Sequence, residues 1–318
     1  MKTLILRFLD LGNEGEMFKS KEKMVTDQLK RVYAFGKDAN GKNVTEGNTN
    51  MKAILGGKGA NLAEMANIGL PVPPGFTISC QTCMEYANSN NTWPEGVLDT
   101  IQEYRLDLEE RIGKKIGDAK DPLLVSVRSG APMSMPGMMD TVLNLGLNDQ
   151  SINGLIKQTE NPRFAWDSYR RFVQMYGDVV LGMKPVNKDD IDPFEAIIEE
   201  VKEAKGVKLD NELEVEDLKE LVKRFKAAVK EQTGQDFPTS AYEQLWGAIC
   251  AVFDSWMNER AILYRKMEGI PDEWGTAVNV QAMVFGNMGD TSATGVCFSR
   301  DAGTGCLLYT SDAADDLT

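Results

Sequence analysis

The chain has 318 residues and no histidine. The absence of histidine excludes a Ser-His-Asp triad, a zinc site with histidine ligands and a phosphohistidine carried on the chain itself. Cysteine is also scarce: the five thiols are an odd number without the spacing of a disulfide framework, so we interpret them as reduced and the protein as cytoplasmic. Cys80 and Cys83 form one CxxC without a second pair, which favours a buried structural role over a redox or zinc site.

Positive charge and long apolar runs are scarce as well. The net charge is −13, with 42% hydrophobic and 26% charged residues, as in an ordinary globular protein. This balance argues against a nucleic acid or an anionic membrane as the main partner, while leaving room for a local cationic pocket. No apolar run is long enough to span a bilayer. Arg7 and Asp10 interrupt the apolar N-terminal patch, so we expect no secretory signal.

The stretch 123–141, LLVSVRSGAPMSMPGMMDT, is the leading candidate for a binding site. A β-type run over 123–127 leads to Arg128, and a loop of small residues and methionines follows. Arginine offers a planar fork of donors to phosphate oxygens, and glycine lets backbone N–H groups approach a ligand closely. The pattern suits a polyphosphate site, but a solvated arginine ahead of a surface loop explains it equally well.

A second candidate anion site lies at 55–71, LGGKGANLAEMANIGLP. Three glycines surround Lys58, and the apolar spacing predicts a helix from about Ala60 that Gly69 and Pro71 end. A glycine-rich turn that opens into a helix presents free N–H groups and a lysine to an anion. The GxxxxGK[ST] spacing of a Walker A motif is absent, and a tight turn with a solvated lysine is the alternative.

Alternation predicts strands and apolar periodicity predicts helices along the rest of the chain. Strands are expected at 30–35, 71–79, 141–147, 276–286 and 291–300, the last two as a hairpin, and helices at 96–115, 161–182 and 240–267. We interpret the aromatic stripe of 161–182 as core packing. The acidic stretch 189–221 is interpreted as solvated helix faces rather than as a metal site.

Five stretches together resemble the N-terminal nucleotide-binding domain of the pyruvate, phosphate dikinases. They are LGGKGANLAEM (55–65), PVPPGFTIS (71–79), the run 121–149, NPRFAWDSYRRFVQMYGDVV (161–180) and DEWGTAVNVQAMVFGNMGDTSATGVCFSR (272–300). The resemblance extends over residues 30–305. The related phosphoenolpyruvate synthases share the SVRS motif but lack the SMPGMMDT loop.

The resemblance implies the fold class α/β (α+β), as an ATP-grasp-like nucleotide-binding domain with a helical insert subdomain. The expected division is a first ATP-grasp subdomain at 30–147, a helical subdomain at 148–235, a helix at 236–275 that returns to the first subdomain, and an incomplete second ATP-grasp subdomain at 276–305. Residues 1–29 match nothing in the family and are interpreted as an extension.

The resemblance also implies that the chain binds MgATP and inorganic phosphate. In the family, a phosphohistidine domain and a pyruvate-binding domain complete the conversion of ATP, phosphate and pyruvate to AMP, pyrophosphate and phosphoenolpyruvate. Neither domain is expected in this sequence, so we expect the chain alone to be inactive and the full-length protein to be a homodimer. The alternatives are a stand-alone ATP-binding module, a phosphoenolpyruvate synthase-type dikinase and an ATP-grasp ligase.

By the same resemblance, Lys58 and Arg128 hold the ATP phosphates and are the candidate catalytic residues. The loop expected to close over the phosphates carries Ser134, Gly137, Met138, Met139, Asp140 and Thr141. Gln281, Met283 and Phe285 match the segment near the adenine. These roles are chemically reasonable because phosphoryl transfer depends largely on positioning and charge neutralisation.

The chain departs from the family after Gly305. The family continues into a strand with two acidic Mg²⁺ ligands, whereas CLLYTSDAADDLT follows here. We interpret 306–318 as a non-native tail and assign none of Asp312, Asp315 and Asp316 to a metal. The Mg²⁺ ligands are therefore expected largely outside this chain, because Mg²⁺ requires carboxylate oxygens in a fixed geometry.

Overall fold

The computed structural model describes residues 30–185 and 191–296, with residues 298, 300, 301 and 304–306 beyond them. The chain divides into two compact units, residues 1–283 and 284–318. The expected extension at 1–29 and all of the expected tail except Cys306 lie outside the described residues. None of the described helices is long and apolar enough to cross a membrane.

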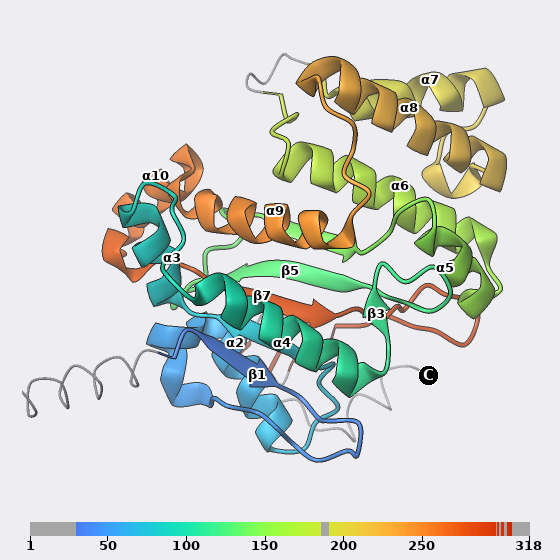
Figure 1. The fold of residues 1–318 in the computed structure, drawn as a ribbon. Coiled ribbons are helices and arrows are strands. Elements are labelled where there is room, and N and C mark those ends of the chain that lie inside the picture. Colours follow the sequence, from blue (N-terminus) through green and yellow to red (C-terminus); the bar gives the residue numbers. More distant parts are fainter. Residues whose placement is uncertain (1–29, 186–190, 297, 299, 302–303, 307–318) are drawn as a thin grey trace, which may run out of the picture. The chain divides into compact units, whose positions relative to one another are not determined.

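A five-stranded antiparallel sheet forms the centre of the first unit (Figure 1). Its strands, in spatial order, are β1 (Val32–Phe35), β2 (Gly75–Ile78), β7 (Ala277–Ala282), β5 (Val125–Gly130) and β6 (Thr141–Leu145). Every residue of β1 and β2 is buried, because elements pack on both faces of the sheet. The combination of sheet and helices confirms the α/β class.

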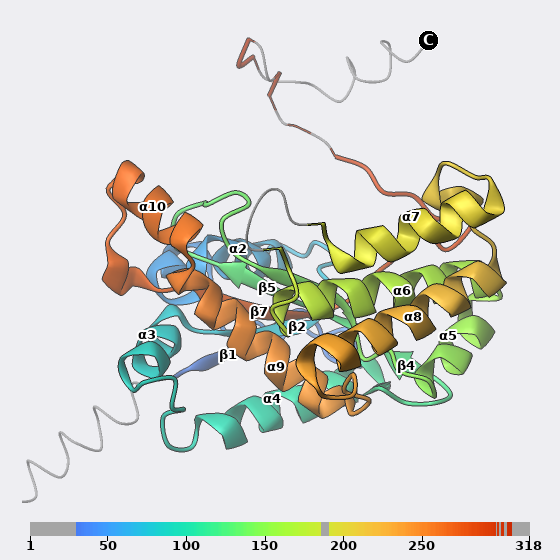
Figure 2. The same cartoon turned by 90° about the horizontal axis from the view of Figure 1, so that it is seen from above.

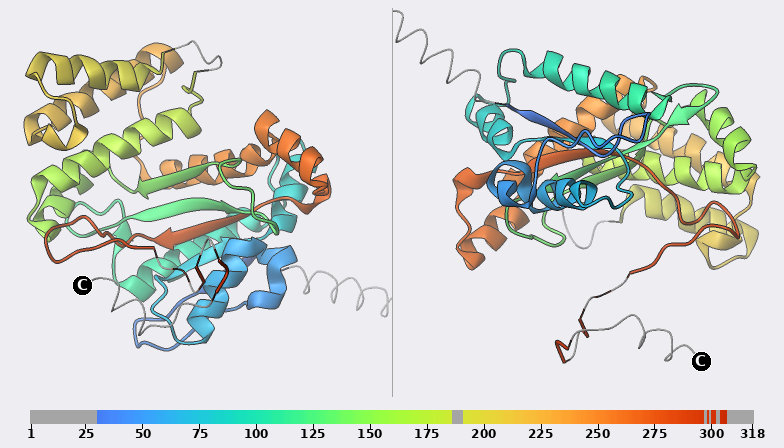
Figure 3. Two further views of the ribbon diagram at one scale, coloured as in Figure 1. Left: turned by 180° about the vertical axis from the view of Figure 1, so that it is seen from behind. Right: turned by 90° about the horizontal axis from the view of Figure 1, so that it is seen from below.

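Helices cover both faces of this sheet (Figures 1 and 3). One face carries α9 (Ala241–Asp254), which packs on β5, β6 and β7, and the other carries α2 (Lys52–Asn67), which packs on β5 and β7. Beside α9, α6 (Pro162–Val179) packs on β6 and supports α8 (Val215–Thr233), on which α7 (Pro193–Lys205) lies (Figure 2).

Shorter elements complete the first unit. They are α3 (Cys80–Asn88), α4 (Val97–Ile112), α5 (Ser151–Thr159), α10 (Glu259–Glu268), the parallel pair β3 (Lys115–Ile116) and β4 (Pro122–Leu123), and the 3-10 turns η1 (Thr49–Met51), η2 (Asp210–Glu212), η3 (Ser255–Met257) and η4 (Asp272–Trp274). The aromatic stripe of α6 is buried, which confirms its role in the core. Cys80 and Cys83 are buried too, and burial raises the pKa of each thiol to about 12, which fits the structural role.

The glycine-rich turn lies inside α2 rather than before it. The helix begins at Lys52, although the sequence pattern placed its start at about Ala60. Gly56, with φ 67° and ψ 171°, interrupts the helical backbone, and the helix then resumes. A Cβ on Gly56 would lie 1.5 Å from the carbonyl oxygen of Gly130, so only glycine permits α2 to approach the end of β5 this closely.

The strand that carries Arg128 is longer than expected. The predicted run ended at Val127, whereas β5 continues to Gly130. Residues of β5 pair one by one with β7, and Arg128 stands opposite Asn279. This pairing with a distant strand holds Ser129 and Gly130 extended, although neither residue favours a strand by itself.

The expected single helix over 240–267 is wrong, because α9 ends at Asp254 and α10 begins at Glu259. Asn258 between them has an extended backbone, with ψ 144°. The break lets Trp256 turn fully into the core, where its Nε1 donates to the carbonyl oxygen of Asp272 at 3.0 Å. At the start of α9, the side chain of Ser240 caps the helix by accepting a hydrogen bond from the backbone N–H of Glu243.

The expected hairpin of 276–286 and 291–300 is also wrong. β7 forms as predicted, but residues 291–296 and 298 are not in a strand. β7 already pairs with β2 along one edge and with β5 along the other, so neither edge is free for a returning strand. Residues 277–282 therefore lie in the same sheet as β1 and β2, which the expected division assigned to a different subdomain.

The contact of α2 with β5 gives a first testable prediction. Gly56→Ala should lower the free energy of unfolding by about 3 kcal/mol or more, because the new methyl group meets a backbone carbonyl at a strained positive φ. Gly69→Ala is the matched control: Gly69 also has a positive φ, but open space surrounds it, so a loss of about 1 kcal/mol is expected. Urea denaturation of both variants measures the difference, and equal losses would contradict the close contact.

Candidate functional site

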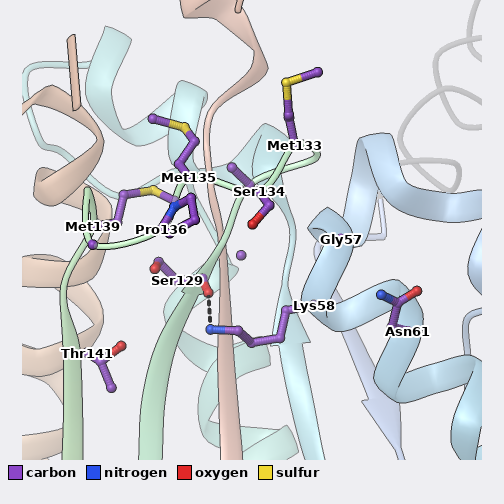
Figure 4. A pocket seen from close by; sticks show the side chains of 13 residues that line it. Gly57, Lys58, Asn61, Ser129, Met133, Ser134, Met135, Pro136, Met139 and Thr141 are labelled. Atoms are coloured by element: carbon purple, nitrogen blue, oxygen red, sulfur yellow. Dashed lines mark hydrogen bonds between the residues drawn. The ribbon is translucent and has the colours of Figure 1, made fainter. Parts of the chain in front are cut away.

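A cavity of about 440 Å³ opens between α2, the end of β5 and the loop that follows β5 (Figure 4). We call residues 131–140 the crest loop. The lining residues are Gly57, Lys58 and Asn61 from α2, Ser129 and Gly130 from β5, and Ala131, Met133, Ser134, Met135, Pro136, Gly137, Met139 and Thr141 from the crest loop and the start of β6. The two stretches that the sequence analysis singled out therefore share one cavity.

Lys58 is held at the floor of this cavity by the approach of α2 to β5. Its Nζ donates a hydrogen bond to the carbonyl oxygen of Ser129 at 2.8 Å (Figure 4). The backbone N–H of Gly57 donates to the carbonyl oxygen of Ala131 at 2.8 Å, which ties the start of the crest loop to α2. Burial, and then the nearby positive charge of Arg128, lower the pKa of Lys58 to about 8.

Arg128 lies on β5 and is held from β7. Its Nη2 donates to the Oε1 of Gln281, and the Nε2 of Gln281 donates to the carbonyl oxygen of Pro73 at 3.0 Å. The buried Nε of Arg128 makes no hydrogen bond to any described residue. Burial lowers the pKa of Arg128. Arg128 is not among the residues that line the cavity, although its charge acts on Lys58, which does line it.

Neither cation has a counter-ion within the described part of the chain. None of the ion pairs found there includes Lys58 or Arg128, and both side chains donate to neutral oxygen atoms instead. Partial burial without an opposite charge is costly for a cation. The same arrangement therefore favours an anion that can approach both residues.

The structure brings four of the predicted loop residues to the cavity and turns two away. Ser134, Gly137, Met139 and Thr141 line it. Asp140 does not, because its Oδ1 accepts a hydrogen bond from the Nη2 of Arg260 at 2.6 Å. Met138 is also absent from the lining, and its carbonyl oxygen accepts from the Nε of Arg260 at 3.1 Å.

The segment assigned to the adenine is not assembled into this cavity. Gln281 is 5% exposed, and both ends of its amide are used by Arg128 and Pro73. The backbone N–H of Met283 donates to the carbonyl oxygen of Leu124 at 2.9 Å. Phe285 belongs to the second unit. The adenine-binding role of these three residues therefore stays a prediction.

Asn61 is a lining residue that sequence reasoning missed. It follows Lys58 by three positions in the resumed helix, so both side chains lie on one helical face. That spacing would have identified it once the helix was known to include Lys58.

The described residues do not fit a Mg²⁺ site. No carboxylate of a described residue lines the cavity, and the same part of the chain contains no group of three histidine, cysteine, aspartate or glutamate residues that could hold a metal. Asp140 adjoins the cavity, but its carboxylate is paired with Arg260. These residues therefore do not supply the set of oxygen ligands that Mg²⁺ requires.

Comparison with known proteins identifies the family. The family model described as "Pyruvate phosphate dikinase, AMP/ATP-binding domain" matches residues 52–105 and 89–314. The chain belongs to this family. The match reaches beyond Cys306 into the segment interpreted as non-native, so that interpretation stays a prediction.

Three relatives show how much of the protein the chain represents. It is 56% identical to pyruvate, phosphate dikinase of Clostridium symbiosum over 261 residues, which cover 82% of the chain and 29% of the relative. It is 52% identical to that of Rhizobium meliloti (strain 1021) over 276 residues, 87% of the chain and 30% of the relative. It is 53% identical to the chloroplastic pyruvate, phosphate dikinase 1 of Arabidopsis thaliana over 276 residues, which cover 87% of the chain and 27% of the relative. The chain thus spans less than a third of these relatives.

The lowered pKa of Lys58 predicts a specific dependence of stability on pH. Between about pH 8 and the ordinary value of 10.5, the unfolded chain binds a proton that the folded chain releases, so stability rises with pH in this window. Lys58→Met should remove this rise. As pH increases from 8 to 10.5, the free energy of unfolding of the wild type should therefore rise relative to that of Lys58→Met.

Urea midpoints measured at several pH values would test this dependence. Lys37→Met is the control, because Lys37 is exposed and lies away from the cavity lining. It should follow the wild type at every pH. A difference between Lys58→Met and the wild type that stays constant with pH would show that Lys58 has an ordinary pKa.

Proposed function

We propose that the cavity binds the phosphates of ATP and that the chain is the nucleotide-binding part of a pyruvate, phosphate dikinase. The observation that carries this proposal is the pair Lys58 and Arg128, two partly buried cations without a counter-ion among the described residues. A polyphosphate would restore the charge balance and offer several oxygen atoms at once. The family, whose printed description names AMP and ATP, supports the same ligand.

The cavity has the properties that a phosphate site requires. Its volume of about 440 Å³ lies within the range of small-molecule pockets. Gly57, Gly130 and Gly137 have no side chains, so a ligand can come close to the backbone at the wall of the cavity. Met133 in the crest loop is 46% exposed and can approach a ligand, whereas Met135 of the same loop is buried and would have to leave its packing if that part of the loop moved. Closure would exclude water from the phosphates.

For the complete protein, the proposal includes the family's reaction of ATP, inorganic phosphate and pyruvate to AMP, pyrophosphate and phosphoenolpyruvate. Lys58 and Arg128 would neutralise the phosphates while a histidine on another domain attacks. Mg²⁺, the phosphohistidine and pyruvate-binding domains, a homodimer and a cytoplasmic location are further parts of this proposal. An ATP-grasp fold with residues 148–235 as its helical insert is the finer fold that we propose.

A titration with ATP tests the phosphate site. We expect the chain to bind ATP in calorimetry, and Lys58→Met and Arg128→Met each to weaken binding about tenfold or more, because the first removes a charged donor from the cavity lining and the second removes a partly buried positive charge beside it. Arg224→Met is the matched control: it removes an arginine that pairs with Glu200 on α7, away from the cavity lining. Tripolyphosphate should compete with ATP, and adenosine should compete poorly. No ATP binding, or equal competition by adenosine, would refute the proposal.

A second experiment tests whether the chain alone can catalyse the complete reaction. Supplied with ATP, phosphate and pyruvate, the chain alone should form no phosphoenolpyruvate, since it has no histidine to carry the phosphoryl group. A full-length relative in the same coupled assay is the positive control. Phosphoenolpyruvate formed by the purified chain would overturn this expectation, and ATP binding without turnover would agree with it.

A further inference from the structure

The break between α9 and α10 places three polar residues against the end of the crest loop. The backbone N–H of Asp140 donates to the Oγ of Ser255 at 3.3 Å, and the Nδ2 of Asn258 donates to the Oδ2 of Asp140 at 3.2 Å. Arg260 donates from Nη2 to the Oδ1 of Asp140 at 2.6 Å and from Nε to the carbonyl oxygen of Met138 at 3.1 Å. Arg260 is therefore the residue that holds both a side chain and the backbone of the loop.

The elements that present Arg260 are themselves firmly held. Trp256 is fully buried, and the guanidinium carbon of Arg265 lies 4.0 Å from the centre of its ring. The Nε of Arg265 donates to the Oδ1 of Asp272 at 2.8 Å, and Nε1 of Trp256 donates to the carbonyl oxygen of the same residue. These contacts fix α10 relative to the end of α9, so the backbone that carries Arg260 is held in place.

The crest loop is thus held at both ends, and between them Met133 is exposed while Met135 is buried. At its start, the carbonyl oxygen of Ala131 accepts from the N–H of Gly57 on α2. At its end, Met138 and Asp140 are tied to α10. Between these points, Gly137 has a positive φ, and a Cβ added there would meet nothing within 4 Å, so there is open space beside the loop at Gly137.

We propose that Arg260 is a positioning residue that fixes the C-terminal end of the crest loop through Asp140 and Met138. In this role it sets where the centre of the loop closes over the cavity. This part of the inference rests on the proposed binding of ATP in the cavity. Asp140 is then an anchor of the loop rather than a ligand of the nucleotide. The helix break at Asn258 has a functional reason, because a continuous helix would carry Arg260 in a different direction.

The geometry requires arginine rather than any cation. Two different nitrogen atoms of one guanidinium reach Asp140 and Met138 at the same time, which a lysine ammonium on a flexible stem reproduces poorly. Lys184 illustrates the weaker alternative: its Nζ is 3.8 Å from the Oδ1 of Asp140. Arg260→Lys should therefore hold the loop only in part.

Hydrogen exchange without any nucleotide tests this role. Peptides that span residues 131–141 would be followed in the wild type, Arg260→Met, Asp140→Asn and the double variant. We expect exchange at the Met138 and Asp140 amides to accelerate about fivefold in Arg260→Met, the effect of losing an exposed ion pair of about 1 kcal/mol. Because both single variants lose the same Arg260–Asp140 ion pair, the effect of the double variant should be smaller than the sum of the two single effects.

The control and the ATP titration separate the possible outcomes. Arg224→Met removes the ion pair with Glu200 on α7 and should leave exchange of the crest loop unchanged. Arg260→Met should also weaken ATP binding, with Arg260→Lys intermediate. Unchanged loop exchange in Arg260→Met, or fully additive effects in the double variant, would overturn the positioning role. If the wild type bound no ATP but the exchange effect were present, the proposed function would fail and the loop anchor would stand.

Discussion

The close backbone contact between α2 and β5 is the constraint on which the site depends. Gly56 interrupts α2 at the point where its backbone meets the carbonyl of Gly130, and any side chain there would collide with it. Because of this contact, the resumed helix brings Lys58 onto the carbonyl oxygen of Ser129. The floor of the cavity is thus built from backbone positions first and from charged side chains second.

The two cations that follow from this arrangement are maintained at a cost in stability. Lys58 and Arg128 are partly desolvated, and the charge of Arg128 acts against that of Lys58. Neutral acceptors, the carbonyl of Ser129 and the amide of Gln281, orient them without neutralising them. Local destabilisation of this kind is expected where a protein is prepared for an anionic ligand.

The crest loop connects this cationic floor to the helical side of the molecule. Its first residue is bonded to α2, and its last residues are bonded to α10. A loop held at both ends can change its shape only in the middle, so the movement that closes it is restricted to a few residues. The anchors therefore limit both the range of the movement and the position of the closed loop.

The sequence by itself determined the approximate positions of the five strands of the sheet, the glycines around Lys58 and the loop that carries Ser134 and Thr141, because these depend on alternation and residue chemistry over a few positions. It wrongly added a strand at 291–300. The shared runs also identified the family, which the comparison confirmed. Only the tertiary structure decided that Gln281 faces Arg128 and that Asp140 faces Arg260. Those pairings depend on the position of β7 between β2 and β5 and on the helix break at Asn258, which involve partners distant in the chain and leave no local signal.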